Sequence, residues 1–237
     1  MIPPNVSVIL GTYNRFALLR DAVESVRSSV KPFSHEIVIT DGGSTDGSLE
    51  WMRSQPDIVI AETGNLRGAV SAFNAAWAAS IGEFVANFND DAVYVDDALA
   101  MGVLALMEST ELDGDVGQVA FEFDAGGSWH IADFYGSDLH CANFGVTRRH
   151  MARKVCAKQG GAHHYWNPIY HTYAGDCEFS AWVWRLGYSV KALPEVRVHD
   201  IWAMDELRQQ NQWKSRGDAL LFNKRWPNAA TIRGKIR

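Results

Sequence analysis

The stretch that decides the fold reads EFVANFNDDAV and covers residues 83–93. Its apolar first half predicts a buried strand, and Asp90 and Asp91 follow that strand directly. Because an unpaired buried charge is costly, we expect these carboxylates to serve a ligand at the end of the strand. With the amide oxygen of Asn89 they offer hard oxygen ligands to a divalent cation such as Mg²⁺ or Mn²⁺, which commonly takes its other ligands from phosphate. The alternative interpretation of an isolated Asp-Asp pair is a turn with solvated acids.

The composition is that of an ordinary folded protein. A chain of 237 residues, of which 47% are hydrophobic, is long enough for one large core, so we expect a single domain over 1–237. The formal net charge is −6, and acidic and basic residues are interspersed. This pattern shows no electrostatic footprint for nucleic acid, which is therefore not an expected partner.

The three cysteines are widely spaced and form no CxxC pattern. They predict neither a disulfide framework nor a zinc knuckle, and they favour a reducing compartment. The sequence shows no basic leader and no apolar run of about 18 residues, so neither a signal peptide nor a membrane span is expected. We therefore expect a cytoplasmic protein for which any membrane contact is peripheral.

The first hundred residues alternate short apolar runs with helical periodicity. Strands are expected over 6–10, 36–40, 57–61 and 83–88, and helices over 16–30, from about 44, and over 68–81. This alternation predicts βαβ units and a mostly parallel sheet with helices on both faces. Since such sheets bind ligands at the carboxyl ends of their strands, residues 11–15, 41–43 and 89–91 are expected around one crevice.

The second half of the chain is less regular. Helices are expected over 97–107, 176–186 and 205–225, strands over 117–123, 129–134, 141–146, 188–193 and 196–199, and a loop over 160–173. The predicted fold class is α/β, with a Rossmann-like, mostly parallel central sheet flanked by helices and a mixed second half. Within the single domain we distinguish a first half over 1–110, a second half over 111–203 and a C-terminal helical extension over 204–237.

Several side chains at the predicted crevice suit a nucleotide. Tyr13 can pack against a base, and the Arg15 guanidinium can offer a fork to phosphate. Asp41 can accept from a base N–H or a ribose hydroxyl, and Arg67 can reach the base or the phosphates. The alternatives are a helix entry for residues 13–15, a turn acid for Asp41 and a solvated loop residue for Arg67.

Four short motifs occur in an order that is more specific than any one of them. They are GTYNR at 11–15, TDGGSTDG at 40–47, NLRG at 65–68 with Asn74, and NDD at 89–91. In order and spacing they resemble the signatures of family 2 inverting glycosyltransferases over residues 5–110, and a weaker resemblance continues to about residue 200. The resemblance implies the GT-A fold, Mn²⁺ or Mg²⁺, and a nucleotide-diphosphate sugar as donor, with a UDP-sugar as the first expectation. It makes 1–110 the nucleotide-sugar-binding half and 111–203 the acceptor half.

The resemblance also implies roles for single residues. Asn89-Asp90-Asp91 stands where the family keeps its DxD motif, so that Asp90 approaches the ribose and Asp91 binds the metal. His199 stands where the family often has a further metal or diphosphate contact. The residues expected around the donor are Thr12, Tyr13, Asn14, Arg15, Asp41, Arg67, Asn89 and Asp90. The chain departs from the family pattern at Asn89 and at Gly43, where an acidic residue is usual.

The predicted base lies in the second half. The segment that begins at Gly175-Asp176 looks like the family segment that carries the catalytic base at the start of a helix, and Asp176 is the matching position. A carboxylate within hydrogen-bond reach of a hydroxyl is a sufficient base. Glu178 is the rival base, and a plain helix N-cap is the alternative role for Asp176. Gly175 stands where the family often has Glu.

The second half is also unusually aromatic. Because sugar rings present C–H faces that stack on aromatic rings, we expect some of these residues to line the acceptor site and Trp182 or Trp184 to belong to the core. The candidates are Trp129, Trp166, Trp182, Trp184, Trp202, His163, His164, Tyr165 and Tyr170.

The sequence therefore predicts a metal-dependent inverting glycosyltransferase acting on a hydroxyl of a carbohydrate or glycoconjugate. One alternative is a catalytically retired protein that binds sugar nucleotide, which would be free to lose Asp176. A nucleotidyltransferase is a further alternative, although it would typically show a Gly-rich signature after the first strand, where this chain has one glycine.

Overall fold

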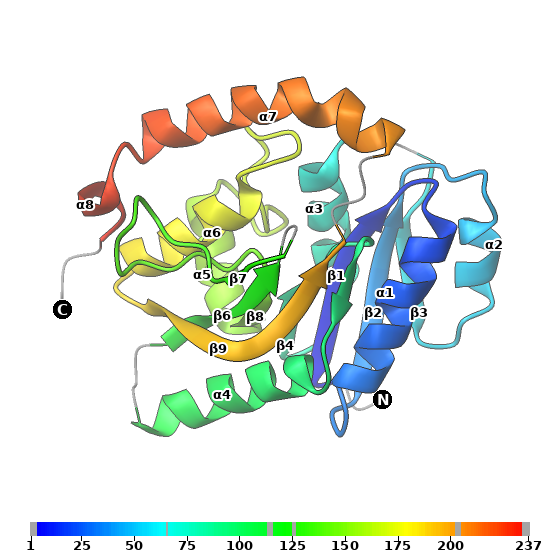
Figure 1. The fold of residues 1–237 in the computed structure, drawn as a ribbon, viewed down its shortest axis with the longest axis horizontal. Coiled ribbons are helices and arrows are strands. Elements are labelled where there is room, and N and C mark those ends of the chain that lie inside the picture. The colour runs from blue at the N-terminus through cyan, green and yellow to red at the C-terminus, as the bar shows by residue number, and fades with distance from the viewer. Residues whose placement is uncertain (1–3, 65, 113–115, 125–126, 202–204, 234–237) are drawn as a thin grey trace.

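Four strands from the first half form the parallel part of the sheet, because each is a short run rich in β-branched and small apolar residues. The computed structural model describes residues 4–64, 66–112, 116–124, 127–201 and 205–233. β1 (Val6–Thr12) pairs in parallel with β2 (His35–Asp41) and β4 (Phe84–Asn87), and β2 pairs in parallel with β3 (Ile58–Glu62). Their carboxyl ends therefore meet at one edge of the sheet (Figure 1).

Helices cover both faces of this parallel part. Side chains alternate along β1, so that Val8 and Leu10 face one side and Ile9 the other. α1 (Phe16–Ser29), α2 (Ser48–Arg53) and α4 (Ala98–Leu112) contribute to the core on the first side, and α3 (Ala69–Ala79) to the core on the second. The sheet is thus buried between two hydrophobic clusters.

The second half of the chain, together with β5 of the first half, extends the same sheet in mixed directions. β8 (Gly145–Arg148) lies antiparallel to β4, and β6 (Val116–Asp124), β9 (Ser189–Asp200) and β5 (Ala92–Tyr94) follow in the order β3-β2-β1-β4-β8-β6-β9-β5. The short β7 (Trp129–His130) pairs with β6. β9 runs parallel to β6 and antiparallel to β5, and it curves as it passes from one to the other (Figure 1). The predicted α/β class, with a parallel first half and a mixed second half, is confirmed.

The residues described after β6 also form four helices. α5 (Arg149–Lys158) and α6 (Gly175–Arg185) pack against the second hydrophobic cluster. α7 (Glu206–Arg225) runs along one edge of the molecule, from near α3 to the short α8 (Ala229–Ile232) (Figure 1). Among the described residues, no helix combines the length and the apolar character that crossing a membrane requires.

The second half contains the largest departures from the predicted elements. The expected strand over 129–134 ends at His130, and the one expected over 141–146 begins only at Gly145. Between them Tyr135 and Gly136 adopt φ values of 62° and 66°, and the Gly136 N–H donates to Asp133 Oδ1 at 2.6 Å, so the chain turns back on itself. The pieces expected over 188–193 and 196–199 form one continuous strand. The cysteines are free thiols.

Gly145 provides a test of the packing at the centre of the sheet. It pairs with Asn87 of β4 and Ala120 of β6, and a Cβ at this position would lie 2.0 Å from the Val119 carbonyl oxygen. Gly145→Ala should therefore lower the free energy of unfolding in urea by about 3 kcal/mol. Gly217→Ala, on α7 with nothing within 4 Å of the new methyl group, is the matched control. It should raise stability by up to about 1 kcal/mol, and equal effects of the two changes would contradict the described packing.

Candidate functional site

One cavity of about 420 Å³ lies at the carboxyl ends of β1, β2 and β4. Parallel pairing brings these strand ends together, although they are far apart in the sequence. Of the residues predicted for the site, those that line this cavity are Thr12, Tyr13, Arg15, Arg67, Asn89, Asp90, Asp91 and Asp176. Asn14, Asp41 and His199 do not line it. The structure thus joins the acidic pair after β4 with the candidate base on α6.

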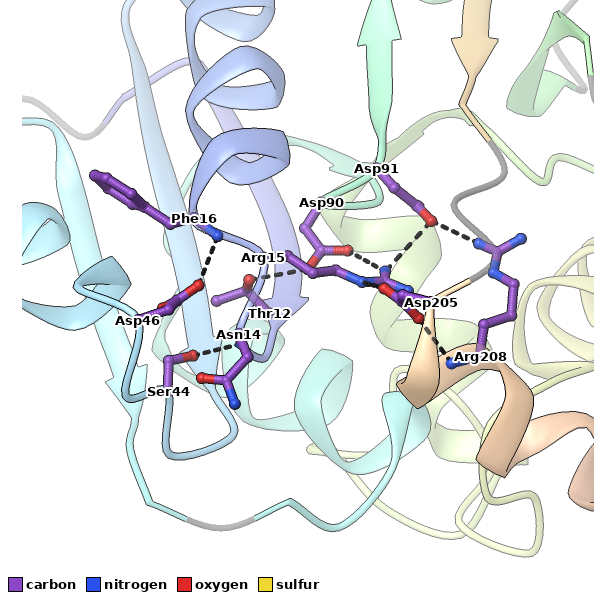
Figure 2. A network of polar contacts seen from close by, with 10 residues as sticks. All are labelled: Thr12, Asn14, Arg15, Phe16, Ser44, Asp46, Asp90, Asp91, Asp205 and Arg208. Atoms are coloured by element: carbon purple, nitrogen blue, oxygen red, sulfur yellow. Dashed lines mark hydrogen bonds and ion pairs between the residues drawn. The ribbon is translucent and has the colours of Figure 1, made fainter.

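The acidic pair is buried and paired with arginine. Asp90 and Asp91 are 5% and 1% exposed. Asp90 accepts hydrogen bonds from Thr12 Oγ1 at 2.9 Å and from Arg15 Nη1 at 2.8 Å. Asp91 Oδ2 lies 3.3 Å from Arg15 Nη1 and 2.6 Å from Arg208 Nη2 (Figure 2). These contacts offset the cost of burying two adjacent carboxylates.

Arg15 stands at the centre of this network. Its Nε donates at 2.5 Å to Oδ2 of Asp205, the residue just before α7. Its Nη1 donates to the acidic pair (Figure 2). Burial alone would lower the pKa of Arg15, but the hydrogen bond to Asp205 and the charges of Asp90 and Asp91 raise it. Burial raises the pKa of Asp90 to about 6, against the opposing charge of Arg15. Arg15 therefore directs these two nitrogens to carboxylates rather than into open solvent.

Asp41 and Asn14 shape the cavity wall instead of facing the cavity. Asp41 is fully buried and accepts the backbone N–H groups of Gly43 at 3.0 Å and Ser44 at 3.1 Å. Asn14 Oδ1 accepts the Thr45 N–H at 2.8 Å, and its own N–H donates to Ser44 Oγ at 2.9 Å. These bonds hold the loop after β2 against the turn after β1. Asp41 thus has the geometry of a turn acid in this structure.

The wall of the cavity beside this loop contains an aromatic and an aliphatic side chain, those of Tyr13 and Leu66. An added Cβ on Gly42 would lie 3.0 Å from Leu66 Cδ1 and 3.1 Å from Tyr13 Cδ2, so these two side chains pack around Gly42. Arg67 borders the same wall, and its exposed guanidinium is paired with Glu62. Asn65, the first residue of the third motif, lies outside the described residues. An aromatic ring next to a glycine backbone is a suitable surface for a nucleoside base.

Asp176 enters the cavity from the first turn of α6. Its Oδ2 accepts a hydrogen bond from Asn143 Nδ2 at 2.9 Å, and its Oδ1 accepts the Cys177 N–H at 2.8 Å. Burial raises the pKa of Asp176. The N-cap of α6 is Ala174, at φ 65°, so Asp176 does not serve as the cap.

Trp166 explains why glycine precedes Asp176. A Cβ on Gly175 would lie 2.6 Å from the Trp166 indole, which packs on Phe73 with ring centroids 3.9 Å apart and lines the cavity. The side chain that the family often has at this position would displace the indole. Trp166 is thus the predicted acceptor-site aromatic that the structure places at the cavity.

Glu178 points away from the cavity into a buried network. It is fully buried and accepts hydrogen bonds from Asn167 at 2.7 Å, from both Nε and Nη2 of Arg225 at 3.0 and 2.8 Å, and from the Tyr170 hydroxyl. Burial acts to raise the pKa of Glu178, but the hydrogen bonds from Arg225, Tyr170 and Asn167 lower it overall. Glu178 has the surroundings of a structural ion pair and not of a base that meets substrate.

His199 and its neighbour Asp200 face different surroundings. The exposed His199 ring lies 3.1 Å from Asp124 through Nδ1 and packs on Trp129 with ring centroids 4.9 Å apart. Asp200 lines the cavity, and the backbone N–H of Ile201 donates to the Asp91 carbonyl oxygen at 2.9 Å. Because successive side chains of a strand point to opposite faces, the structure brings Asp200 and not His199 to the cavity that the acidic pair also lines.

The other aromatic candidates are spread through the second half. Trp182 and Trp184 pack against the core, as predicted for at least one of them, and Tyr165 and Tyr170 are buried in it. His163 and His164 border a separate hollow beside α3. Trp202 lies outside the described residues.

The start of α7 is the part of the site that sequence reasoning missed. Leu207, Arg208 and Asn211 line the cavity, although the helix was expected only as an extension. Asp205 caps the helix by accepting the Arg208 N–H at 2.9 Å, and this cap was the only local signal. A cap predicts where a helix begins. It does not predict that the helix lines the same cavity as an acidic pair more than 100 positions earlier in the sequence.

The residues around Asp91 fit a divalent cation that arrives with phosphate. Among the described residues, no three His, Cys, Asp or Glu side chains gather into a complete metal site. Asn89, Asp91 and Asp200 nevertheless bring oxygen atoms to one cavity. Asp91 Oδ2 is in contact with two positively charged guanidinium groups, so this oxygen atom lies where a cation can bind. Mg²⁺ and its relatives are usually held by one or two carboxylates and by substrate phosphates rather than by an all-protein cage.

Solved structures with the same fold are glycosyltransferases. The mannosyltransferase PcManGT from Pyrobaculum calidifontis, solved with GDP-Man and Mn²⁺, is 20% identical with a TM-score of 0.65, and the match covers 93% of this chain and 63% of that one. S. aureus TarS is 16% identical with a TM-score of 0.62 over 82% of this chain and 60% of that one, and its complex with UDP-GlcNAc gives a TM-score of 0.61. The chain thus spans about three fifths of the length of these chains. At such identities the likeness establishes the GT-A fold alone.

The search of curated proteins found no significant match. The family model described as glycosyl transferase family 2 matches residues 7–172, which include the turn after β1, the acidic pair and most of the cavity wall. This match confirms the resemblance seen in the four sequence motifs: the chain belongs to glycosyl transferase family 2.

Proposed function

We propose that the protein is a metal-dependent, inverting glycosyltransferase that moves a hexosyl group from a nucleotide-diphosphate donor to a hydroxyl of a carbohydrate or glycoconjugate. The observation that carries this proposal is the meeting of Asp90 and Asp91 with Asp176 in one cavity. The first two come from the end of β4 and the third from the start of α6. The proposed donor site and the proposed base are therefore supplied by the first and the second half of the chain.

The nucleoside of the donor is assigned to the wall formed by Tyr13, Gly42 and Leu66. Tyr13 offers a ring face to the base, and Thr12 and Arg67 border the same space. A UDP-sugar remains our first expectation. Because the related PcManGT was solved with GDP-Man and TarS with UDP-GlcNAc, guanosine donors are tested beside uridine donors.

Asp91, with Asp200 and Asn89, is assigned to the divalent cation. When bound, such a cation stabilises the negative charge that develops on the departing diphosphate. Arg15 keeps Asp90 and Asp91 in place through hydrogen bonds of 2.8 and 3.3 Å. The contribution of the protein is thus a positioned set of oxygen ligands.

Asp176 is assigned as the base. Its carboxylate takes the proton of the acceptor hydroxyl, the hydroxyl oxygen attacks the anomeric carbon, and the bond from that carbon to the diphosphate oxygen breaks with its electron pair. The hydrogen bond from Asn143 orients the carboxylate toward the cavity. Because this scheme has a single displacement, the configuration at the anomeric carbon is inverted. The position of Asp176 in the cavity favours an active enzyme over a retired sugar-nucleotide-binding protein.

The donor and the cation are tested by thermal stabilisation. A panel of UDP- and GDP-sugars is screened with Mn²⁺, with Mg²⁺ and with EDTA, followed by a search for sugar transfer to saccharide acceptors. A donor present at 100 times its Kd should add about 2.7 kcal/mol of stability, and the gain should require the metal. Asp91→Asn should remove most of this gain. Absence of stabilisation by every donor under every condition would refute the proposed function.

The base is tested by Asp176→Asn, which keeps the size of the side chain and removes its basicity. Donor affinity should be retained while kcat falls by a factor on the order of 10² or more. Because burial raises the pKa of Asp176 and the base must be ionised, the wild-type rate should fall with decreasing pH at a midpoint above the ordinary aspartate range. A pH–rate profile and the anomeric configuration of the product check these points. Near wild-type turnover, or retention of configuration, would overturn the assignment.

Glu178→Gln is the matched comparison for Asp176→Asn. Since Glu178 is buried with Arg225 and Tyr170, its replacement should lower the free energy of unfolding by about 2 kcal/mol. At a temperature where the variant is folded, kcat should stay within about threefold of wild type, because Glu178 does not line the cavity. Urea unfolding and steady-state kinetics measure the two effects. A stable variant with a large loss of kcat would transfer the role of the base to Glu178.

A further inference from the structure

Arg208 reaches the candidate metal carboxylate from the far end of the chain. Its Nη2 lies 2.6 Å from Asp91 Oδ2, and both side chains are largely buried, at 13% and 2% exposure (Figure 2). The same cavity is assigned to the donor diphosphate and its cation. A cation bound at Asp91 and the Arg208 guanidinium would therefore compete for one carboxylate.

The charges around Asp91 favour a change of partner for Arg208. In the cluster drawn in Figure 2, Arg15 and Arg208 face three carboxylates, those of Asp90, Asp91 and Asp205. A diphosphate alone would add negative charge to a cluster that is already acidic. A divalent cation at Asp91 offsets that charge, and it repels a guanidinium on the same oxygen. A guanidinium displaced from Asp91 then has phosphate oxygens within the same cavity as partners.

We propose that Arg208 exchanges partners during donor binding: it pairs with Asp91 while the donor is absent, and it binds the donor diphosphate when a divalent cation takes Asp91. The proposal rests on the proposed function. It makes Arg208 a diphosphate-binding residue and a competitor of the cation at the same time.

Arg15 is not equivalent to Arg208 in this exchange. Arg15 is held by Asp205 at 2.5 Å and by Asp90 at 2.8 Å, and its contact with Asp91 is longer, at 3.3 Å. It therefore has strong partners that persist when a cation takes Asp91. Arg208 makes the shorter of the two contacts with Asp91, and this contact is the one that a cation would replace.

The exchange needs only a movement of the Arg208 side chain, because the helix that carries it is anchored elsewhere. Asp218 of α7 accepts the backbone N–H groups of Thr172 at 2.9 Å and Tyr173 at 2.8 Å. Asp205 caps the start of this helix by accepting the backbone N–H of Arg208, which lies in the first turn. The guanidinium can thus turn from Asp91 to the diphosphate while α7 stays in place.

The competition is measured by Mn²⁺ binding without nucleotide. The full chain is titrated with Mn²⁺ by electron paramagnetic resonance, as wild type, Arg208→Gln and Arg216→Gln, an exposed arginine on the same helix. Arg208→Gln should bind Mn²⁺ about tenfold more tightly, because the competing charge is gone. Arg216→Gln should match the wild type. Equal Mn²⁺ affinity in Arg208→Gln and wild type would overturn the exchange.

The second arm measures nucleotide binding at saturating Mn²⁺. In Arg208→Gln the affinity for UDP, or for GDP if the wild type prefers it, should fall by a factor of roughly 10 to 100, the range of a charge-assisted hydrogen bond. The affinity for the corresponding monophosphate should change less than about threefold, because the lost contact is to the second phosphate. Equal losses for diphosphate and monophosphate would refute the assignment to the diphosphate.

Two controls test whether the effects of Arg208→Gln come from a folding defect: the charge-conserving variant Arg208→Lys, and thermal unfolding curves of every variant. Lysine keeps the charge, so this variant should bind Mn²⁺ like the wild type and lose less diphosphate affinity than Arg208→Gln. A wild-type chain that binds no nucleotide diphosphate under any condition would instead refute the proposed function. The failure of the exchange and the failure of the function are therefore distinguished by the wild-type data.

Discussion

The arrangement of the site depends on the pairing of Arg15 with the buried acids after β4. Two adjacent carboxylates cannot be buried at a strand end without a compensating charge. Arg15 supplies it from the turn after β1, with contacts of 2.8 Å to Asp90 and 3.3 Å to Asp91. The same guanidinium reaches Asp205, directly before α7. One side chain thus connects the ends of two parallel strands to the start of α7.

α7 closes the cavity and joins the two halves of the molecule. Arg208 contacts Asp91, and Asp218 accepts backbone N–H groups from the loop that contains the cavity residues Thr172 and Tyr173. Near its end, Arg225 pairs with the buried Glu178 of α6. Each of these polar contacts involves a buried carboxylate, so hydrogen-bond geometry, and not apolar packing alone, determines the position of α7. The parts of the cavity wall that come from the two halves of the chain therefore share one support.

The acidic residues of the site have different roles because their surroundings differ. Asp41 accepts hydrogen bonds from backbone N–H groups of its own loop, and Glu178 accepts them from Arg225 and from other buried side chains. Asp90 and Asp91 face a cavity but carry arginine partners. Asp176 meets the same cavity with an amide and a backbone N–H as its partners, and burial raises its pKa. Of these acids, Asp176 is in the surroundings expected of a base.

Local patterns in the sequence were sufficient to predict the class of the fold and the cavity residues that the first half of the chain contributes. Alternating periodicities identified the strands that end at Thr12, Asp41 and Asn87. Since parallel strands place their carboxyl ends at one edge, the gathering of Thr12, Tyr13, Arg15 and the acidic pair followed from the order of the elements.

Only the tertiary structure decided which of these side chains face the cavity. The sequence motifs alone did not show that Asp41 binds N–H groups of its own loop, that Asp200 rather than His199 lines the cavity, or that Arg208 pairs with Asp91. The physical reason is that local sequence determines backbone preference and periodicity, whereas the partner of a buried charge is chosen by contacts between segments far apart in the chain. The sequence by itself therefore determined the strands and the acids that end them, and the folded chain determined what each acid binds.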